Sequence, residues 1–125
     1  MSDTPQARIL VVEEHPRLRQ LLHIVLSRAQ HAVDLAASPE AAMRRLATAV
    51  YDLAIVDADA NGSRAATGPR VADALRTAQP GLAVVLLTNC YQTAPQPGVD
   101  AVVAKPFTPT QLRTVVAHTL APAGR

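Results

Sequence analysis

This chain has only one cysteine, and its sequence shows no segment that would direct the protein to a membrane or span one. The single Cys90 excludes an intramolecular disulfide and a CxxC motif, which favours a reducing compartment. The first residues lack a basic region followed by an apolar one, and no apolar run approaches the ~18 residues of a membrane span. We therefore expect a cytoplasmic protein without a membrane partner.

Lysine is also nearly missing, because eleven of the twelve basic residues are arginine. The arginines that fall in helical stretches are not interleaved with aromatic residues, so we interpret them as a solvated face and expect no direct nucleic-acid binding. They include Arg17, Arg19, Arg28, Arg44 and Arg45. Lys105 is the one lysine in a chain that otherwise uses arginine, so we expect it to have a specific chemical role.

The length of 125 residues, with 49% hydrophobic and 18% charged residues, suits one domain with a single core. We place this domain at residues 6–121. Short apolar runs without alternation are typical of strands buried on both faces of a parallel sheet. The predicted strands are residues 8–12, 32–36, 52–57, 82–88 and 101–104.

Apolar residues recur at helical spacing between and after these strands. The predicted helices begin at Pro16, run from the Ser38 cap through about Thr48, run from near Arg70 to Ala78, and open at Thr108-Pro109. This alternation of strands and helices predicts a doubly wound α/β sheet.

Polar residues stand where the predicted strands end. They are Glu13 and Glu14, Asp57, Thr88 and Lys105. Because ligands of open α/β sheets bind outside the carboxyl ends of the strands, we expect these side chains to converge. Crowded carboxylates favour a hard cation such as Mg²⁺, and a carboxylate can attack a phosphoryl group whose charge an amine and a hydroxyl stabilise.

The order of three motifs resembles the response regulator receiver domains of two-component signalling, over residues 9 to about 120. The motifs are ILVVEEHP at residues 9–16, YDLAIVD at residues 51–57 and KPF at residues 105–107. The resemblance implies a flavodoxin-like fold, a five-stranded parallel sheet with strand order 2-1-3-4-5.

The resemblance also implies a metal site. Glu14 and Asp57 would bind Mg²⁺ directly together with the backbone carbonyl of Asp59, and Glu13 would help through a water molecule.

A phosphoryl site is implied as well. Asp57 would be the phosphoacceptor, Thr88 the switch hydroxyl, and Lys105 the partner of the phosphoryl oxygens. The donor would be a phosphohistidine on a histidine kinase or phosphotransfer protein, and any enzymatic activity would be at most slow self-dephosphorylation. The downstream partner is not indicated.

Several positions depart from the family pattern. Glu14 replaces the usual aspartate, Asn89 replaces a very small residue, and Val102 replaces an aromatic residue. Residues 89–100 are few and contain two prolines and a glycine, so we expect the fourth helix to be shortened or missing. These departures keep open a second hypothesis, a degenerate receiver that binds a protein partner without phosphorylation.

A more distant alternative is a phosphatase of the haloacid dehalogenase type. Residues 53–59 resemble the hydrophobic strand and DxD motif with which such enzymes begin. Such enzymes need further acids after their lysine to hold Mg²⁺, but no aspartate or glutamate follows Asp100. The sequence therefore favours the receiver.

Overall fold

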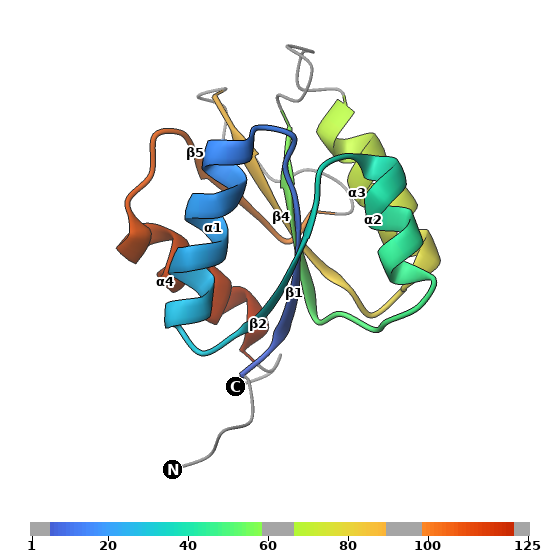
Figure 1. Cartoon of the computed structure of the whole chain (residues 1–125), viewed down its shortest axis with the longest axis horizontal. Helices are drawn as coiled ribbons and strands as arrows, with labels where there is room; N and C mark the ends of the chain where they lie inside the picture. Colours follow the sequence, from blue (N-terminus) through green and yellow to red (C-terminus); the bar gives the residue numbers. More distant parts are fainter. Residues whose placement is uncertain (1–5, 59–66, 90–98, 122–125) are drawn as a thin grey trace.

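A five-stranded parallel sheet with strand order β2-β1-β3-β4-β5 forms the centre of the protein, as predicted (Figure 1). The computed structural model describes residues 6–58, 67–89 and 99–121. The strands are β1 (Arg8–Val12), β2 (Ala32–Ala36), β3 (Leu53–Asp57), β4 (Ala83–Thr88) and β5 (Ala101–Ala104). The fold is flavodoxin-like, and each strand lies within a run that the sequence predicted.

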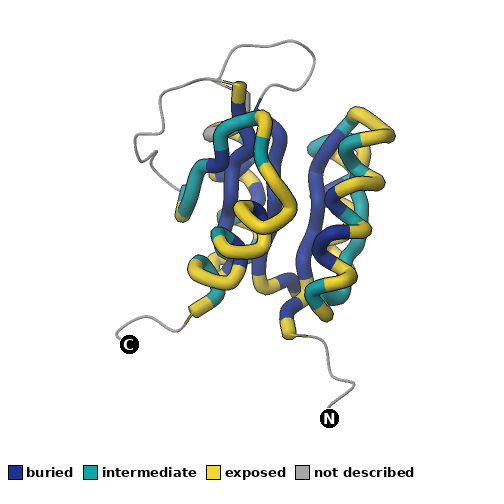
Figure 2. The backbone as a smooth tube through the Cα atoms, turned by 90° about the vertical axis from the view of Figure 1, so that its left-hand side faces the viewer, coloured by how far each residue is buried: buried dark blue, intermediate teal, exposed yellow. Residues whose placement is uncertain are grey.

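Helices cover both faces of the sheet (Figure 1). They are α1 (Pro16–Arg28), α2 (Pro39–Leu46), α3 (Thr67–Ala78) and α4 (Pro109–Leu120). Helices α1 and α4 lie on one face, and α2 and α3 lie on the other. The central strands β1, β3 and β4 between them are almost entirely buried, whereas most residues of the edge strands β2 and β5 are half-buried (Figure 2).

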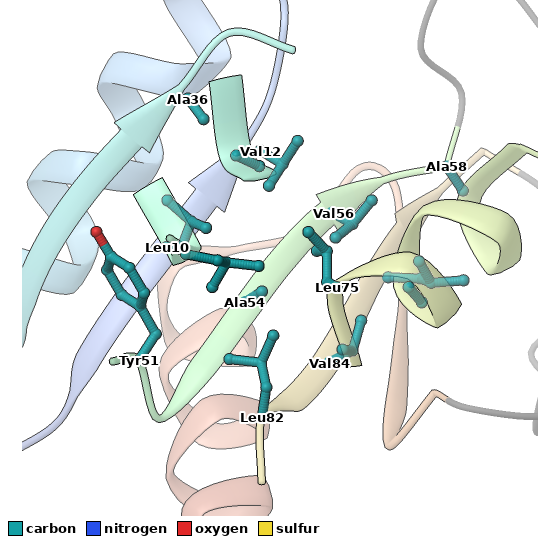
Figure 3. Close-up of a cluster of buried hydrophobic side chains, with 14 residues drawn as sticks. Leu10, Val12, Ala36, Tyr51, Ala54, Val56, Ala58, Leu75, Leu82 and Val84 are labelled. Carbon is teal, nitrogen blue, oxygen red and sulfur yellow. The ribbon is translucent and has the colours of Figure 1, made fainter. Parts of the chain in front are cut away.

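Alternate residues of each central strand enter two separate cores, because successive side chains of a strand point to opposite faces. On β1, Ile9 and Val11 pack under α1 and α4, whereas Leu10 and Val12 pack under α2 and α3. Figure 3 shows the second of these cores, with Ala54 and other β3 and β4 residues beside β1. Both cores need apolar residues, which explains the unbroken apolar runs in the sequence.

The predicted helix starts are found with small differences. The Ser38 hydroxyl accepts a hydrogen bond from the Ala41 amide at 3.1 Å, and Thr108 forms a capping box with Gln111. Helix α3 begins at Thr67, earlier than predicted, because Pro69 in the first turn loses no intrahelical hydrogen bond. Helix α2 ends at Leu46, slightly before the predicted end.

The predicted loss of the fourth helix concerns residues 90–98, which lie outside the described residues, as does Cys90. Between β4 and β5 the structure therefore describes only Asn89, Val99 and Asp100. In the part of the chain that is described, no helix has the length and apolar character needed to cross a membrane.

Candidate functional site

The carboxyl ends of the strands bring the predicted site residues to one edge of the sheet. Asp57 is the last residue of β3 and lies beside Leu87 of β4, so Thr88, the last residue of β4, is one step beyond it. The Lys105 amide, directly after β5, donates to the Thr88 carbonyl at 2.8 Å. Glu13 follows β1, and its amide donates to the Ala36 carbonyl at 3.0 Å.

Lys105 and Asp57 form a short ion pair. Lys105 Nζ lies 2.7 Å from Asp57 Oδ1, and the side chains are 16% and 3% exposed, respectively. A carboxylate that is so thoroughly buried needs a partner to remain charged, and the ammonium group provides one. The uniqueness of this lysine in the sequence thus coincides with a specific contact.

Glu13 is the other buried acid of the site, only 2% exposed. Its Oε2 accepts the His15 amide at 3.1 Å, but its buried Oε1 has no hydrogen-bond partner among the described residues. The pKa of Glu13 is raised to about 7: burial is the largest cause, the Asp57 carboxylate also raises it, and the His15 amide and Lys105 lower it. A protonated Glu13 would donate to Asp57, but two ionised carboxylates offer each other only acceptors.

A pocket of about 360 Å³ opens next to these carboxylates. Glu13, Glu14 and Asp57 line one part of it, and the start of α2 with Glu40 lines another. Apolar side chains from β1, β3 and α3 complete the wall: Val12, Val56 and Val71. Glu14 is half-buried, so the acid pair of the sequence divides into one buried and one partly accessible residue.

The residues at this pocket fit a magnesium ion. Mg²⁺ uses one or two carboxylates and keeps several of its water molecules. The unpartnered Oε1 of Glu13 beside Asp57 is the kind of buried oxygen that a cation would satisfy. Within residues 6–58, 67–89 and 99–121, no group of three or more acidic, histidine or cysteine side chains is arranged so that it could hold a metal ion by itself. Asp59, the remaining predicted ligand, lies outside the described residues.

Thr88, Asn89 and Val102, which the sequence analysis named, differ in their burial. Thr88 is buried, with 4% of its surface exposed, and Asn89 next to it is exposed. Val102 on β5 is half-buried and packs against the core beneath α2 and α3. His15 is exposed at the start of α1, where its side chain forms no helix cap.

Arg19 has a contact that the sequence analysis missed. We expected a solvated arginine on a helical face, but Arg19 is half-buried, and its Nη1 donates to the backbone carbonyls of Glu13 and Glu14. Its position in the first turn of a helix, where a basic residue is unfavourably placed in the field of the helix dipole, does not single it out, because the exposed Arg17 lies in the same turn.

Known proteins resemble this chain in both sequence and structure. The sequence profile of the response regulator receiver domain family matches residues 9–117. The transcriptional regulatory protein ResD of Bacillus subtilis is 29% identical over 117 residues, which are 90% of this chain and 47% of ResD. The chain thus spans about half the length of this curated relative.

Solved structures share the fold. The response regulator TrrA of Thermotoga maritima, crystallised with Mg²⁺-BeF, has a TM-score of 0.77 and 29% identity, with 90% of this chain and 97% of TrrA covered. The Vibrio cholerae chemotaxis protein CheY4 has a TM-score of 0.75 and 23% identity, with 90% of this chain and 98% of CheY4 covered. At that identity, CheY4 supports the fold alone.

Proposed function

We propose, for a chain that belongs to the response regulator receiver domain family, that Asp57 accepts a phosphoryl group from a partner protein. Receiver domains are parts of two-component systems and are not a classical enzyme family. The observation that supports the proposal most is the 2.7 Å contact between Lys105 Nζ and Asp57 Oδ1, beside the buried carboxylate of Glu13. The contact joins a nucleophile and a cation at the pocket.

The proposed step is the transfer of a phosphoryl group from a phosphohistidine of a histidine kinase or phosphotransfer protein. A carboxylate oxygen of Asp57 attacks phosphorus, the bond between phosphorus and the imidazole nitrogen breaks, and the leaving imidazole takes a proton from solvent. Lys105 and Thr88 then stabilise the negative charge on the phosphoryl oxygens of the acyl phosphate. Self-dephosphorylation by water would be slow at most.

Glu13, Glu14 and Asp57 would hold Mg²⁺ in this state, with the Asp59 carbonyl as a further ligand. When bound, the ion would neutralise negative charge on the phosphoryl oxygens. The complex of the similar TrrA with Mg²⁺-BeF supports this assignment. The carboxylates would supply all of the ligand charge, because a backbone carbonyl and water are neutral, and the valine side chains of the pocket wall would limit its solvation.

A second candidate function is a receiver that binds its partner without phosphorylation. Glu14 favours it, because its carboxylate is one methylene longer than the usual aspartate at a site where Mg²⁺ demands strict geometry. The exposed Asn89 beside Thr88 favours it as well, since a larger side chain there narrows the approach of a donor histidine.

Intact-mass measurement after incubation with acetyl phosphate and Mg²⁺ tests the proposal. We expect one labile phosphoryl group on the wild-type chain and none on Asp57→Asn. Asp73→Asn is the matched control, because it makes the same change at an exposed position of α3. Undiminished labelling of Asp57→Asn would show that another residue is the nucleophile, and unlabelled wild type would favour the second candidate.

A further inference from the structure

Arg19 links the first turn of α1 to the loop that carries the acid pair. Its Nη1 lies 3.0 Å from the backbone oxygen of Glu13 and 3.3 Å from that of Glu14. Both bonds come from a half-buried guanidinium group, and hydrogen bonds with an ionised donor are stronger than neutral ones. The contact therefore joins a side chain outside the pocket to the backbone of two residues that line it.

The stability of α1 does not account for this arginine. A cation near the amino end of a helix meets the positive end of the helix dipole, where an acidic residue is favoured. The first turn of α1 contains no acidic residue, and His15 at its cap position provides no side-chain hydrogen bond. The favourable partners of Arg19 are thus the loop carbonyls rather than the helix that carries it.

The two carbonyls belong to the peptide groups on either side of the Glu14 Cα atom. When both peptide groups are held, the direction of the Cα–Cβ bond of Glu14 is held as well. Glu13 is restrained independently, since its amide donates to Ala36 and its Oε2 accepts the His15 amide. Arg19 therefore acts mainly on Glu14, which is the accessible acid of the pocket.

We propose that Arg19 is a positioning residue for the divalent-cation site: it orients Glu14 through the backbone and so sets the affinity for Mg²⁺. The inference rests on the proposed function, because that function supplies the cation. Partners that orient metal ligands typically change metal affinity by about 10- to 100-fold when they are removed.

A purely electrostatic role and a positioning role of Arg19 predict opposite changes in Mg²⁺ affinity when the side chain is removed. Removal of a cation close to an acidic pocket strengthens the attraction for Mg²⁺ if Coulomb interaction is all that matters. Loss of the two backbone contacts weakens Mg²⁺ binding, because Glu14 then samples directions that do not face the ion. The sign of the change therefore separates the two roles.

The test is a Mg²⁺ titration of the wild-type chain, Arg19→Gln, Arg19→Lys and Arg17→Gln, followed by amide chemical shifts. Arg17→Gln is the matched control, because it removes the same charge from an exposed position of the same turn. We expect Arg19→Gln to weaken binding by about tenfold. Arg19→Lys should recover part of the affinity, since the ammonium group keeps the charge but lacks the fixed planar geometry of the guanidinium group. Arg17→Gln should leave the affinity unchanged or slightly tighter.

Hydrogen exchange in the metal-free proteins is the second measurement. We expect faster exchange of the Glu14 and His15 amides in Arg19→Gln and unchanged exchange in β3. A general loss of stability would instead speed exchange in β3 as well. Equal or tighter Mg²⁺ binding by Arg19→Gln, with a wild type that binds Mg²⁺, would overturn the inference alone. A wild type without any saturable response to Mg²⁺ would overturn the metal assignment in the proposed function, and the role of Arg19 with it.

Discussion

Two groups of polar residues lie toward opposite ends of the same sheet and differ in how well their charges are satisfied. The amino-end cluster consists of Arg8, Asp34, Tyr51 and Asp52. The Tyr51 hydroxyl and Arg8 Nη2 both donate to Asp34, and the Arg8 amide donates to the Asp52 carboxylate at 2.8 Å. The Arg8 guanidinium also lies 5.1 Å from the centre of the Tyr51 ring. Every member of this cluster has a partner.

The pKa values of the amino-end cluster agree with these hydrogen bonds. The hydrogen bond from Tyr51 and the nearby arginines lower the pKa of Asp34. Burial and the contact with Asp34 raise the pKa of Tyr51 to about 12. Both shifts favour the protonation states that hold the cluster together at neutral pH, so this cluster stabilises the fold.

The carboxyl-end cluster consists of Glu13, Asp57 and Lys105 and is arranged differently. One ammonium group faces two buried carboxylates, Glu13 retains an unpartnered oxygen, and its pKa rises to about 7. Such an arrangement costs stability in the absence of a ligand, and it persists because the surrounding strands hold it in place. The comparison teaches that a buried carboxylate oxygen without a hydrogen-bond partner among the described residues, Oε1 of Glu13, marks the functional end of this sheet.

Lys105→Ala should have the largest effect, because it removes the only cation that contacts Asp57 among the described residues. A buried carboxylate left without its partner costs about 3 kcal/mol of unfolding free energy. The loss of stability should be smaller at about pH 5. A buried carboxyl group that has lost its cation takes up a proton more readily at the lower pH, and the neutral form is less costly to bury. Urea unfolding at the two pH values measures this.

Lys105→Arg separates charge from shape at the same position. The planar guanidinium retains the charge but does not replace a compact ammonium group beside a phosphoryl oxygen. We expect it to recover most of the stability but not the level or lifetime of acetyl-phosphate labelling, which Lys105→Ala depresses. If both variants show the wild-type level of labelling and the wild-type phosphoryl lifetime, Lys105 has a structural role only, and the two clusters do not differ in function.

Glu13→Gln should stabilise the metal-free protein at high pH. The folded-state pKa is raised from 4.5 to about 7, so the folded protein binds the Glu13 proton more tightly than the unfolded chain does. The unfolding free energy of the wild type therefore falls as pH rises through this window, by an amount on the order of 2 kcal/mol, and the neutral amide escapes that loss.

Unfolding in the presence of a chelator at about pH 5 and about pH 8 measures the effect of Glu13→Gln. The variant should resemble wild type at the lower pH, exceed it at the higher pH, and bind Mg²⁺ more weakly. Equal stability of the two proteins at the higher pH would show that Glu13 is not strained in the metal-free state.

The strands, helix starts and convergence of the site could be predicted from sequence because each depends on local patterns. Unbroken apolar runs indicated strands with two buried faces, and Ser38 and Thr108 indicated helix starts. Parallel strands end at a common edge, so the placement of Asp57 and Lys105 followed from the strand order.

The contacts of Arg19 and Tyr51 could not be predicted in this way, because they depend on distances between elements. Nothing in the sequence says that Arg19 reaches back to the carbonyls of Glu13 and Glu14 rather than out to solvent. Tyr51, just before β3, meets Asp34 of β2 across β1, and only the β2-β1-β3 order brings them close. The difference in burial between Glu13 and Glu14 was hidden for the same reason.

Tyr51→Phe tests the amino-end cluster and should cost about 1 kcal/mol, because it removes one hydrogen bond to a partly exposed carboxylate and leaves the ring in place. The lowered pKa of Asp34 contributes stability that is present above the unfolded-state value of 3.8 and is lost as pH falls through the folded-state value. The variant should therefore lose less stability than wild type on acidification. Thermal unfolding at neutral and acid pH measures both effects, and acetyl-phosphate labelling should be unchanged. A labelling defect would contradict the division between the two clusters.

Glu14→Asp should have the smallest effect and acts on affinity alone. Glu14 is half-buried at the pocket, so a shorter side chain there costs little stability. The shorter carboxylate should sit closer to the position that the strict octahedral shell of Mg²⁺ requires, and we expect binding to tighten about threefold, or by about 0.7 kcal/mol.

Glu40→Asp is the matched control, because Glu40 lines the same pocket from α2 and undergoes the same shortening. Isothermal titration with MgCl₂ compares the two. Equal tightening in both variants would indicate that pocket volume rather than ligand geometry limits the affinity, and weaker binding by Glu14→Asp would mean that the longer side chain is the better fit to this particular loop.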